Sequence, residues 1–147
     1  MSPTRDRAVS TAVGYVLTLG ITTVLVSGLL LAAGGAVDDR REETTRNTLE
    51  VVGQRLAANL MSADRLAATD DARTVSVTVD LPERIAGSEY SVRVNGSSST
   101  LVLDADRTDA TRRVSFVAST PVASTTVRGG RLRIVLSPAS ELEVRSA

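Results

Sequence analysis

The chain has 147 residues, enough for one modest domain beside an N-terminal segment, and its 17 basic and 17 acidic residues give zero net charge. It contains no histidine, cysteine or lysine, which excludes imidazole bases, thiol nucleophiles, disulfides, serine–lysine chemistry, lipid attachment through cysteine and ordinary zinc sites. We therefore expect no enzyme, cofactor or metal site, and the balanced charge favours no nucleic-acid partner.

A run of uncharged residues, 8–37, begins close to the N-terminus. A membrane-spanning helix needs about 20 mostly apolar residues, and serine and threonine hydroxyls inside it can bond to the preceding helical turn. We therefore expect a transmembrane helix over residues 9–37. Two simpler interpretations remain: a plain single-pass anchor, which fits the length, and a cleaved secretory signal, whose apolar stretch of about 7–15 residues is much shorter.

Small residues are concentrated in this run, which holds five of the ten glycines of the chain. Each interior glycine costs a helix about 1 kcal/mol relative to alanine, so a lone anchor gains little from them. A stripe of small residues recurs at every fourth position and consists of Ser10, Gly14, Thr18 and Thr22. Apolar helices approach one another closely along such stripes, so the stripe predicts a helix-packing face.

The junction before the run is its most specific feature. The polar segment MSPTRDR ends at Arg7-Ala8, and the apolar run continues with Val9 and Ser10. This junction resembles that of the archaeal type IV pilins, whose class III signal peptide is a brief charged leader that ends in a basic residue followed by glycine or alanine. The stretch AVSTAVG is similar to the usual start of that family, Ala-Val-Ser-Pro, two apolar residues and glycine, with Gly14 at the glycine position.

The resemblance implies that a prepilin peptidase recognises Arg7-Ala8 and cuts between Ala8 and Val9 on the cytoplasmic side. Residues 1–8 would be the leader, and the retained helix would hold the subunit in the cell membrane, with the N-terminus cytoplasmic and the C-terminal domain extracellular. Such subunits pack through their helices into adhesive surface filaments. Thr11 stands where many members have proline and Tyr15 is unusually bulky, which fits a specialised or minor pilin as well as a major one. The alternative is a membrane-anchored extracellular binding domain that never polymerises.

The helical pattern continues over residues 38–68 but becomes amphipathic. Apolar residues at helical spacing are Leu49, Val52, Leu56, Leu60 and Ala63, and the polar residues away from them are Arg46, Glu50, Gln54, Asn59 and Asp64. Glu42 is placed to pair with Arg46 one turn later. We expect one long helix over residues 9–67 with Gly34-Gly35 as the preferred kink, and the alternative is a linker followed by a separate helix.

Residues 69–147 are strand-like, because apolar and polar residues alternate in short segments. The expected strands cover residues 74–81, 89–94, 100–104, 113–118, 122–127, 131–136 and 141–145. Asn95-Gly96 predicts a hairpin in which both residues tolerate positive φ, and Gly129-Gly130 predicts a second turn. A small antiparallel sheet or sandwich with so few aromatics is marginal alone, so we expect the amphipathic helix to cover it in an α+β fold.

Three polar groups are candidate sites in this module. Asn95-Gly96-Ser97 is an N-glycosylation sequon, although the turn alone also explains these residues. Carboxylates that could recruit a hard cation such as Ca²⁺ are Asp104, Asp106 and Asp109, but the segment lacks the glycine and terminal glutamate of an EF-hand loop, and solvated turn carboxylates are favoured. Arginines that could bind an anion are Arg128, Arg131 and Arg133, for which an exposed hairpin is the favoured interpretation.

Overall fold

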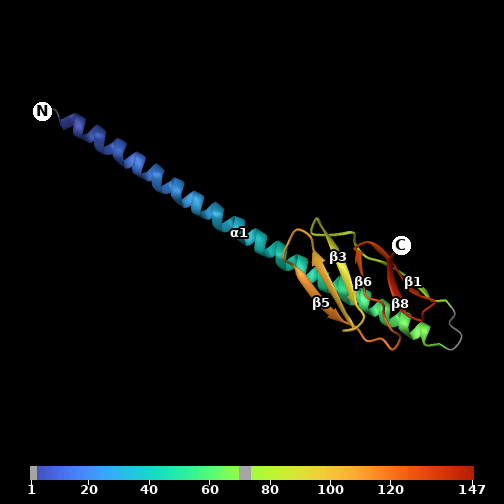
Figure 1. Cartoon of the computed structure of the whole chain (residues 1–147). Helices are drawn as coiled ribbons and strands as arrows, with labels where there is room; N and C mark the ends of the chain where they lie inside the picture. Colours follow the sequence, from blue (N-terminus) through green and yellow to red (C-terminus); the bar gives the residue numbers. More distant parts are fainter. Residues whose placement is uncertain (1–2, 70–73) are drawn as a thin grey trace. The chain divides into compact units, whose positions relative to one another are not determined.

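The computed structural model describes the backbone of residues 3–69 and 74–147, and the side chains within these ranges from residue 11 onward (Figure 1). One long helix, α1 (Pro3–Ala67), is followed by a series of short strands. The chain divides into two compact units, residues 1–40 and residues 41–147. The first unit is helical, and the second contains the remainder of α1 together with all the described strands, so the expected α+β fold is confirmed.

Helix α1 begins at Pro3, earlier than the expected start at residue 9. Proline suits the first position of a helix, because its fixed φ is already helical and its missing N–H would have no intrahelical partner there. The helix ends at Ala67, as expected, and every residue in between is helical. Gly34-Gly35 therefore does not interrupt the helix, and the alternative of a linker followed by a separate helix is wrong.

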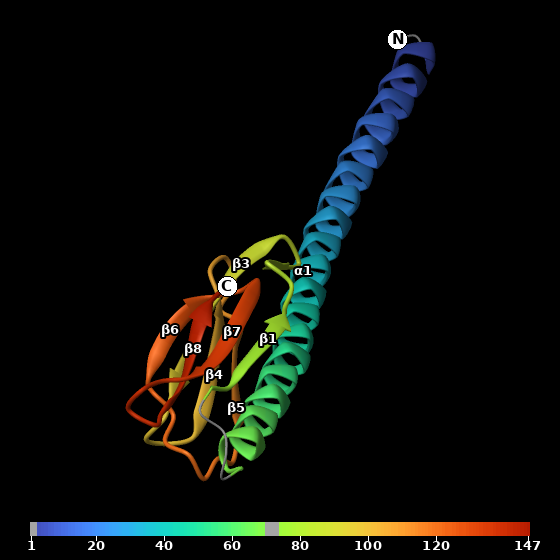
Figure 2. The ribbon, with the colours of Figure 1, turned by 90° about the vertical axis from the view of Figure 1, so that its right-hand side faces the viewer.

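The strands of the second unit form two antiparallel sheets (Figure 2). Their bounds are β1 (Ser76–Asp80), β2 (Arg84–Ile85), β3 (Ser88–Asn95), β4 (Thr100–Ala105), β5 (Thr111–Ser115), β6 (Thr125–Arg128), β7 (Arg131–Leu136) and β8 (Leu142–Ser146). One sheet has the order β1-β7-β8, and the other has the order β2-β3-β4-β5 with β6 also paired to β3. The two-residue strand β2 was not expected, and β5 and β6 are shifted by a few residues from the expected 113–118 and 122–127.

One hydrophobic core joins the helix to both sheets. The five apolar residues predicted to face the strands are all buried, and Leu49, Leu56 and Leu60 have no exposed surface. The strands contribute alternate residues, as their pattern predicts, and the buried ones include Val92, Val94, Leu101, Leu103, Leu132, Ile134, Leu142 and Val144. The amphipathic half of α1 therefore completes a core that the sheets alone would leave open on one side.

Close contact between the helix and the larger sheet depends on a glycine. A Cβ atom added to Gly53 would lie 2.7 Å from Val114 Cγ2 and 2.9 Å from Leu103 Cδ1. Beside this contact, Arg112 of β5 lies 3.6 Å from Glu50 of the helix, measured from Nε to Oε2. The helix therefore packs directly on β4 and β5.

The hairpin after β3 forms where it was expected, but the reason for its glycine differs. Asn95 pairs with Thr100, so the loop spans residues 96–99, and the residue with positive φ is Ser99 (φ 49°). Gly96 is instead required by a close approach, because a Cβ atom there would lie 1.7 Å from the carbonyl oxygen of Val122. The predicted hairpin is therefore confirmed, but neither Asn95 nor Gly96 uses the positive φ that both residues tolerate.

The Gly129-Gly130 turn is confirmed, and it carries the chain from β6 in one sheet to β7 in the other. Gly130 has a φ of 120°, and a Cβ atom on Gly129 would lie 2.3 Å from the ring of Tyr90. The Tyr90 hydroxyl donates a hydrogen bond of 2.7 Å to the carbonyl of Pro82, and burial raises the pKa of this phenol to about 12. The turn therefore packs on a buried tyrosine that Gly129 leaves room for, and Gly130 supplies the positive φ.

Asp64 departs from the expected pattern, since it lies buried although it was assigned to the polar side of the helix. Its carboxylate accepts hydrogen bonds from the backbone N–H groups of Ser119 (3.0 Å) and Thr120 (2.8 Å). Burial alone would raise the pKa of this carboxyl, but the hydrogen bonds outweigh it and the pKa is lowered. Asp64 therefore fastens the end of the helix to the segment between β5 and β6.

We expect Asp64→Ala to lower the free energy of unfolding by about 2–4 kcal/mol, because two backbone N–H groups lose a charged acceptor. The folded-state pKa is depressed, so the carboxylate contributes its full stabilisation above the unfolded pKa and loses it as the pH falls through the folded pKa. Urea unfolding of the full chain in detergent, followed by circular dichroism at pH 7 and at pH 3, measures both effects. Asp109→Ala, at an exposed carboxylate, is the control, and equal losses in the two variants would contradict the assignment.

Candidate functional site

The apolar part of α1 has no cover from the described part of the chain. All side chains from residue 11 to residue 40 are exposed. The large apolar ones are Val13, Tyr15, Val16, Leu17, Leu19, Ile21, Val24, Leu25, Val26, Leu29, Leu30, Leu31 and Val37. This helix, with a mean hydropathy of 2.2 over its most apolar window, is long and apolar enough to cross a membrane, which suggests either membrane anchoring or a signal sequence.

The hydroxyl groups inside this stretch are satisfied within the helix, as predicted. Thr18 donates to the carbonyl of Gly14 and Thr22 to that of Thr18, each at 2.8 Å. The same bond, also at 2.8 Å, links Thr23 to Leu19 and Ser27 to Thr23. Because these donors do not depend on water, the polar residues do not prevent burial in lipid or against another apolar helix.

Three members of the stripe lie among the described side chains, and their role in helix packing stays a prediction. Gly14, Thr18 and Thr22 follow one another at one-turn intervals along the helix and are linked by the hydroxyl bonds above. No atom lies within 4 Å of a Cβ position on Gly14, so its face is open to a neighbouring helix. The side chains of Ser10 and of the processing residues Arg7, Ala8 and Val9 lie outside the described residues, although their backbone belongs to α1.

A second helix feature was not identified from the sequence. An apolar hollow centres on Gly20 and is lined by Val16, Leu17, Gly20, Ile21, Val24 and Leu25. Leu17, Gly20, Ile21 and Val24 are spaced as the four residues of a hole that receives a side chain from a packed helix. The sequence signal for this hollow is a glycine, Gly20, flanked by large apolar residues at this spacing.

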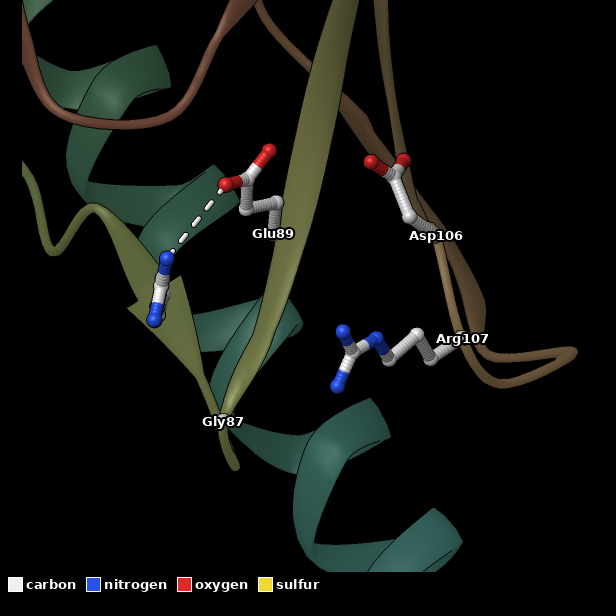
Figure 3. Close-up of a pocket in the computed structure, with 5 residues that line it drawn as sticks. Gly87, Glu89, Asp106 and Arg107 are labelled. Carbon is white, nitrogen blue, oxygen red and sulfur yellow. Dashed lines mark ion pairs between the residues drawn. The ribbon is translucent and has the colours of Figure 1, made fainter.

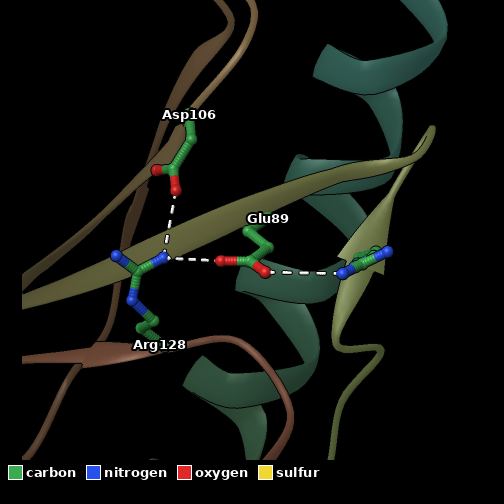
Figure 4. A network of polar contacts seen from close by, with 4 residues as sticks. Glu89, Asp106 and Arg128 are labelled. Carbon is green, nitrogen blue, oxygen red and sulfur yellow. Dashed lines mark hydrogen bonds and ion pairs between the residues drawn. The ribbon is translucent and has the colours of Figure 1, made fainter.

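The arginines around the second glycine turn do not gather into an anion site. Nη1 of Arg128 lies 2.9 Å from Glu89 and 3.0 Å from Asp106 (Figure 4). Nε of Arg131 lies 2.7 Å from Asp80. Two of the three predicted arginines therefore already have carboxylate partners, in agreement with the favoured interpretation of an exposed hairpin.

Two of the three predicted aspartates at the β4–β5 connection, Asp104 and Asp106, have different protein partners. Asp104 accepts a hydrogen bond of 2.7 Å from the Thr111 hydroxyl, whereas Asp106 is paired with Arg128. Among the side chains described for residues 11–69 and 74–147, no group of three potential metal-ligating residues is found. These carboxylates thus act as turn and ion-pair residues in this structure.

Asn95 is exposed at the end of β3. Its Oδ1 accepts a hydrogen bond of 3.1 Å from the N–H of Ser98, which closes the loop. Its Nδ2, the atom that a glycan would modify, has no hydrogen-bond partner among the residues that the structure covers. The turn and the sequon therefore coexist, and glycosylation remains a prediction.

Comparisons with known proteins give a family without an activity. The model of a family of unknown function, DUF7266, matches residues 4–146, a range that includes both the apolar helix and the strands. No curated protein matches the chain, and no solved structure does. The pilin resemblance at the junction is therefore accompanied by a pilin-like architecture, but by no named pilin relative.

We expect Gly14→Val to weaken self-association of the full chain in detergent at least fivefold, because the added side chain separates helices that approach along the stripe. Gly34→Val is the matched control, since about 3.6 residues per turn place residue 34 on the opposite face. Sedimentation equilibrium measures the association constant of each variant. Equal weakening by both substitutions would contradict a specific packing face.

We expect Asn95 to carry a glycan when the protein is isolated from its native cells, because the sequon is exposed and its amide nitrogen is accessible. Mass spectrometry of the peptide that contains Asn95 should show added mass, and Ser97→Ala should abolish it while leaving the asparagine in place. An unmodified wild-type peptide would contradict the prediction.

Proposed function

Because the chain belongs to DUF7266, a family of unknown function, we propose its role from its own residues: a type IV pilin-like structural subunit. The N-terminal helix holds the subunit in the membrane, and the subunit is then assembled into, or associated with, a surface filament that serves adhesion. The proposal joins the charged leader and small-residue stripe to the architecture of one long helix followed by antiparallel strands.

The observation that carries the proposal is the difference between the two stretches of α1. The apolar stripe of the second stretch, Leu49, Val52, Leu56, Leu60 and Ala63, is buried in the core of the second unit, whereas every large apolar side chain described between residues 11 and 37 is at least 49% exposed. Lipid alone would satisfy the exposed stretch, but lipid does not explain five glycines, which together disfavour the helix by about 5 kcal/mol relative to alanine. Close packing against other helices does explain the glycine of the stripe, Gly14, because small residues let backbones approach.

The proposed sequence of events begins with the leader. A prepilin peptidase removes residues 1–8 on the cytoplasmic side, and the mature chain begins at Val9. The helix remains in the cell membrane with its C-terminal unit outside, and assembly then transfers it from lipid to a filament core of similar helices. This transfer requires that its hydroxyl groups have partners within the helix, as the bonds of Thr18, Thr22, Thr23 and Ser27 provide.

The competing role is a single-pass anchor for an extracellular binding domain that does not polymerise. It is supported by the same exposed apolar surface, because a helix surrounded by lipid needs no protein partner. The two roles differ in leader processing and in self-association.

We expect terminal peptide mass spectrometry of the protein from native membranes to find Val9 as the first residue. Ala8→Leu should retain Met1 or Ser2 at the terminus, because a bulky residue replaces the small one before the cut. Ala32→Leu, the same change inside the helix, should be processed normally. A wild-type protein that keeps residues 1–8 would contradict the proposal, and a new terminus near Val37 would indicate a secretory signal instead.

A further inference from the structure

A polar hollow lies on the surface of the second unit, apart from the helix. It has a volume of about 290 Å³ and is lined by Arg84, Gly87, Glu89, Asp106 and Arg107 (Figure 3). These residues come from β2, from the start of β3 and from the end of β4 and the turn that follows it. The volume is close to the lower limit, about 300 Å³, of pockets that hold small ligands.

The carboxylates of this hollow are held by arginines. Arg128 bridges Glu89 and Asp106, and Arg84 lies 3.5 Å from the second oxygen of Glu89. Each carboxylate keeps acceptor positions, because its two oxygens offer about four lone-pair sites. Glu89 and Asp106 can therefore still accept hydrogen bonds from hydroxyl groups of a ligand.

Arg107 is the charged lining residue of the hollow for which the described chain shows no ion pair. Figure 3 shows its guanidinium directed away from its own turn, toward the side of the hollow where Gly87 lies. It takes part in no ion pair within the part of the chain that the structure describes. In the lining, Arg84 and Arg107 balance the two carboxylates, and Arg128, which pairs with both carboxylates from outside the lining, adds a third positive charge.

Gly87 keeps this side of the hollow open. Its φ is +80°, a conformation that side chains disfavour, and no atom lies within 4 Å of its Cβ position. A ligand can therefore approach the β2–β3 turn at Gly87 without meeting a side chain of that residue.

We infer that this hollow binds an acidic sugar, such as a uronate residue of a surface polysaccharide, with its carboxylate on Arg107 and its hydroxyl groups on Glu89 and Asp106. The planar guanidinium fork matches a carboxylate in a bidentate manner. The adjacent carboxylates disfavour a bare or multiply charged anion, but they provide acceptors for a ligand that also carries hydroxyl donors. The inference goes beyond the proposed filament role and does not depend on helix assembly.

The test is a titration of the isotope-labelled full chain in a nonionic detergent, at constant ionic strength, with sodium glucuronate, glucose, acetate and inorganic phosphate as separate probes. We expect glucuronate to produce saturable chemical-shift changes at the amides of residues 84–89 and 105–108. Arg107→Gln should weaken this binding at least tenfold, and Arg107→Lys should weaken it less, because it keeps the charge and loses the fork. Arg113→Gln, at an exposed arginine of β5, should leave the affinity within twofold of wild type.

An unchanged unfolding midpoint in Arg107→Gln shows that its effect is local. Absence of saturable binding by the wild-type protein, or equal binding by Arg107→Gln, would overturn the inference. Acetate or phosphate that binds as tightly as glucuronate would show that the hollow is a site for bare anions. Glucose that binds as tightly as glucuronate would show that the carboxylate of the ligand does not contribute to binding. Either result would also overturn the acidic-sugar assignment, while leaving the test of leader processing unaffected.

Discussion

The second unit depends on one apolar face of α1. Leu49, Leu56 and Leu60 are completely buried, and burying each one is worth about 1.5–3 kcal/mol relative to leaving it in water. The part of the unit after the helix supplies two aromatic side chains to the same core, Tyr90 of β3 and Phe116 just after β5, so it cannot replace this contribution. The Asp64 carboxylate then fastens the end of the helix to the β5–β6 connection. The helix within residues 41–67 is therefore a structural part of this unit and not a detachable stalk.

The first unit has the opposite property, since its helix presents apolar side chains for which the described chain offers no cover. Such a surface is stable only in lipid or against other proteins. Its hydroxyl groups are hydrogen-bonded within the helix, so they permit burial in lipid and burial against protein alike. Gly14, on the stripe of small residues, favours packing against protein. A helix with these features suits a subunit that first resides in a membrane and then assembles with other copies of itself. This is the basis of the pilin-like proposal.

Periodicity was sufficient to predict most of the fold, because the spacing marks most of the helix and strand residues that enter the core. It predicted the buried face from Leu49 to Ala63 and the alternation in β3, β4 and β7. It failed where a tertiary contact decides the outcome: Asp64 looks like an ordinary surface residue until Ser119 and Thr120 are placed beside it. Gly96 likewise looks like a turn glycine, although the backbone of Val122 is what excludes a side chain there. The cluster around Glu89 was invisible for the same reason, since its arginines come from separate strands.

The central claim is that α1 buries its apolar stretch against copies of itself in a surface filament. Immunogold electron microscopy of intact cells, with an antibody against the second unit and a strain lacking the protein as control, tests this claim most directly. The account predicts gold particles along filaments, with a Gly14→Val strain showing fewer or shorter labelled filaments and a Gly34→Val strain showing normal ones. Label spread evenly over the cell surface, with filaments unchanged in the strain that lacks the protein, would contradict it.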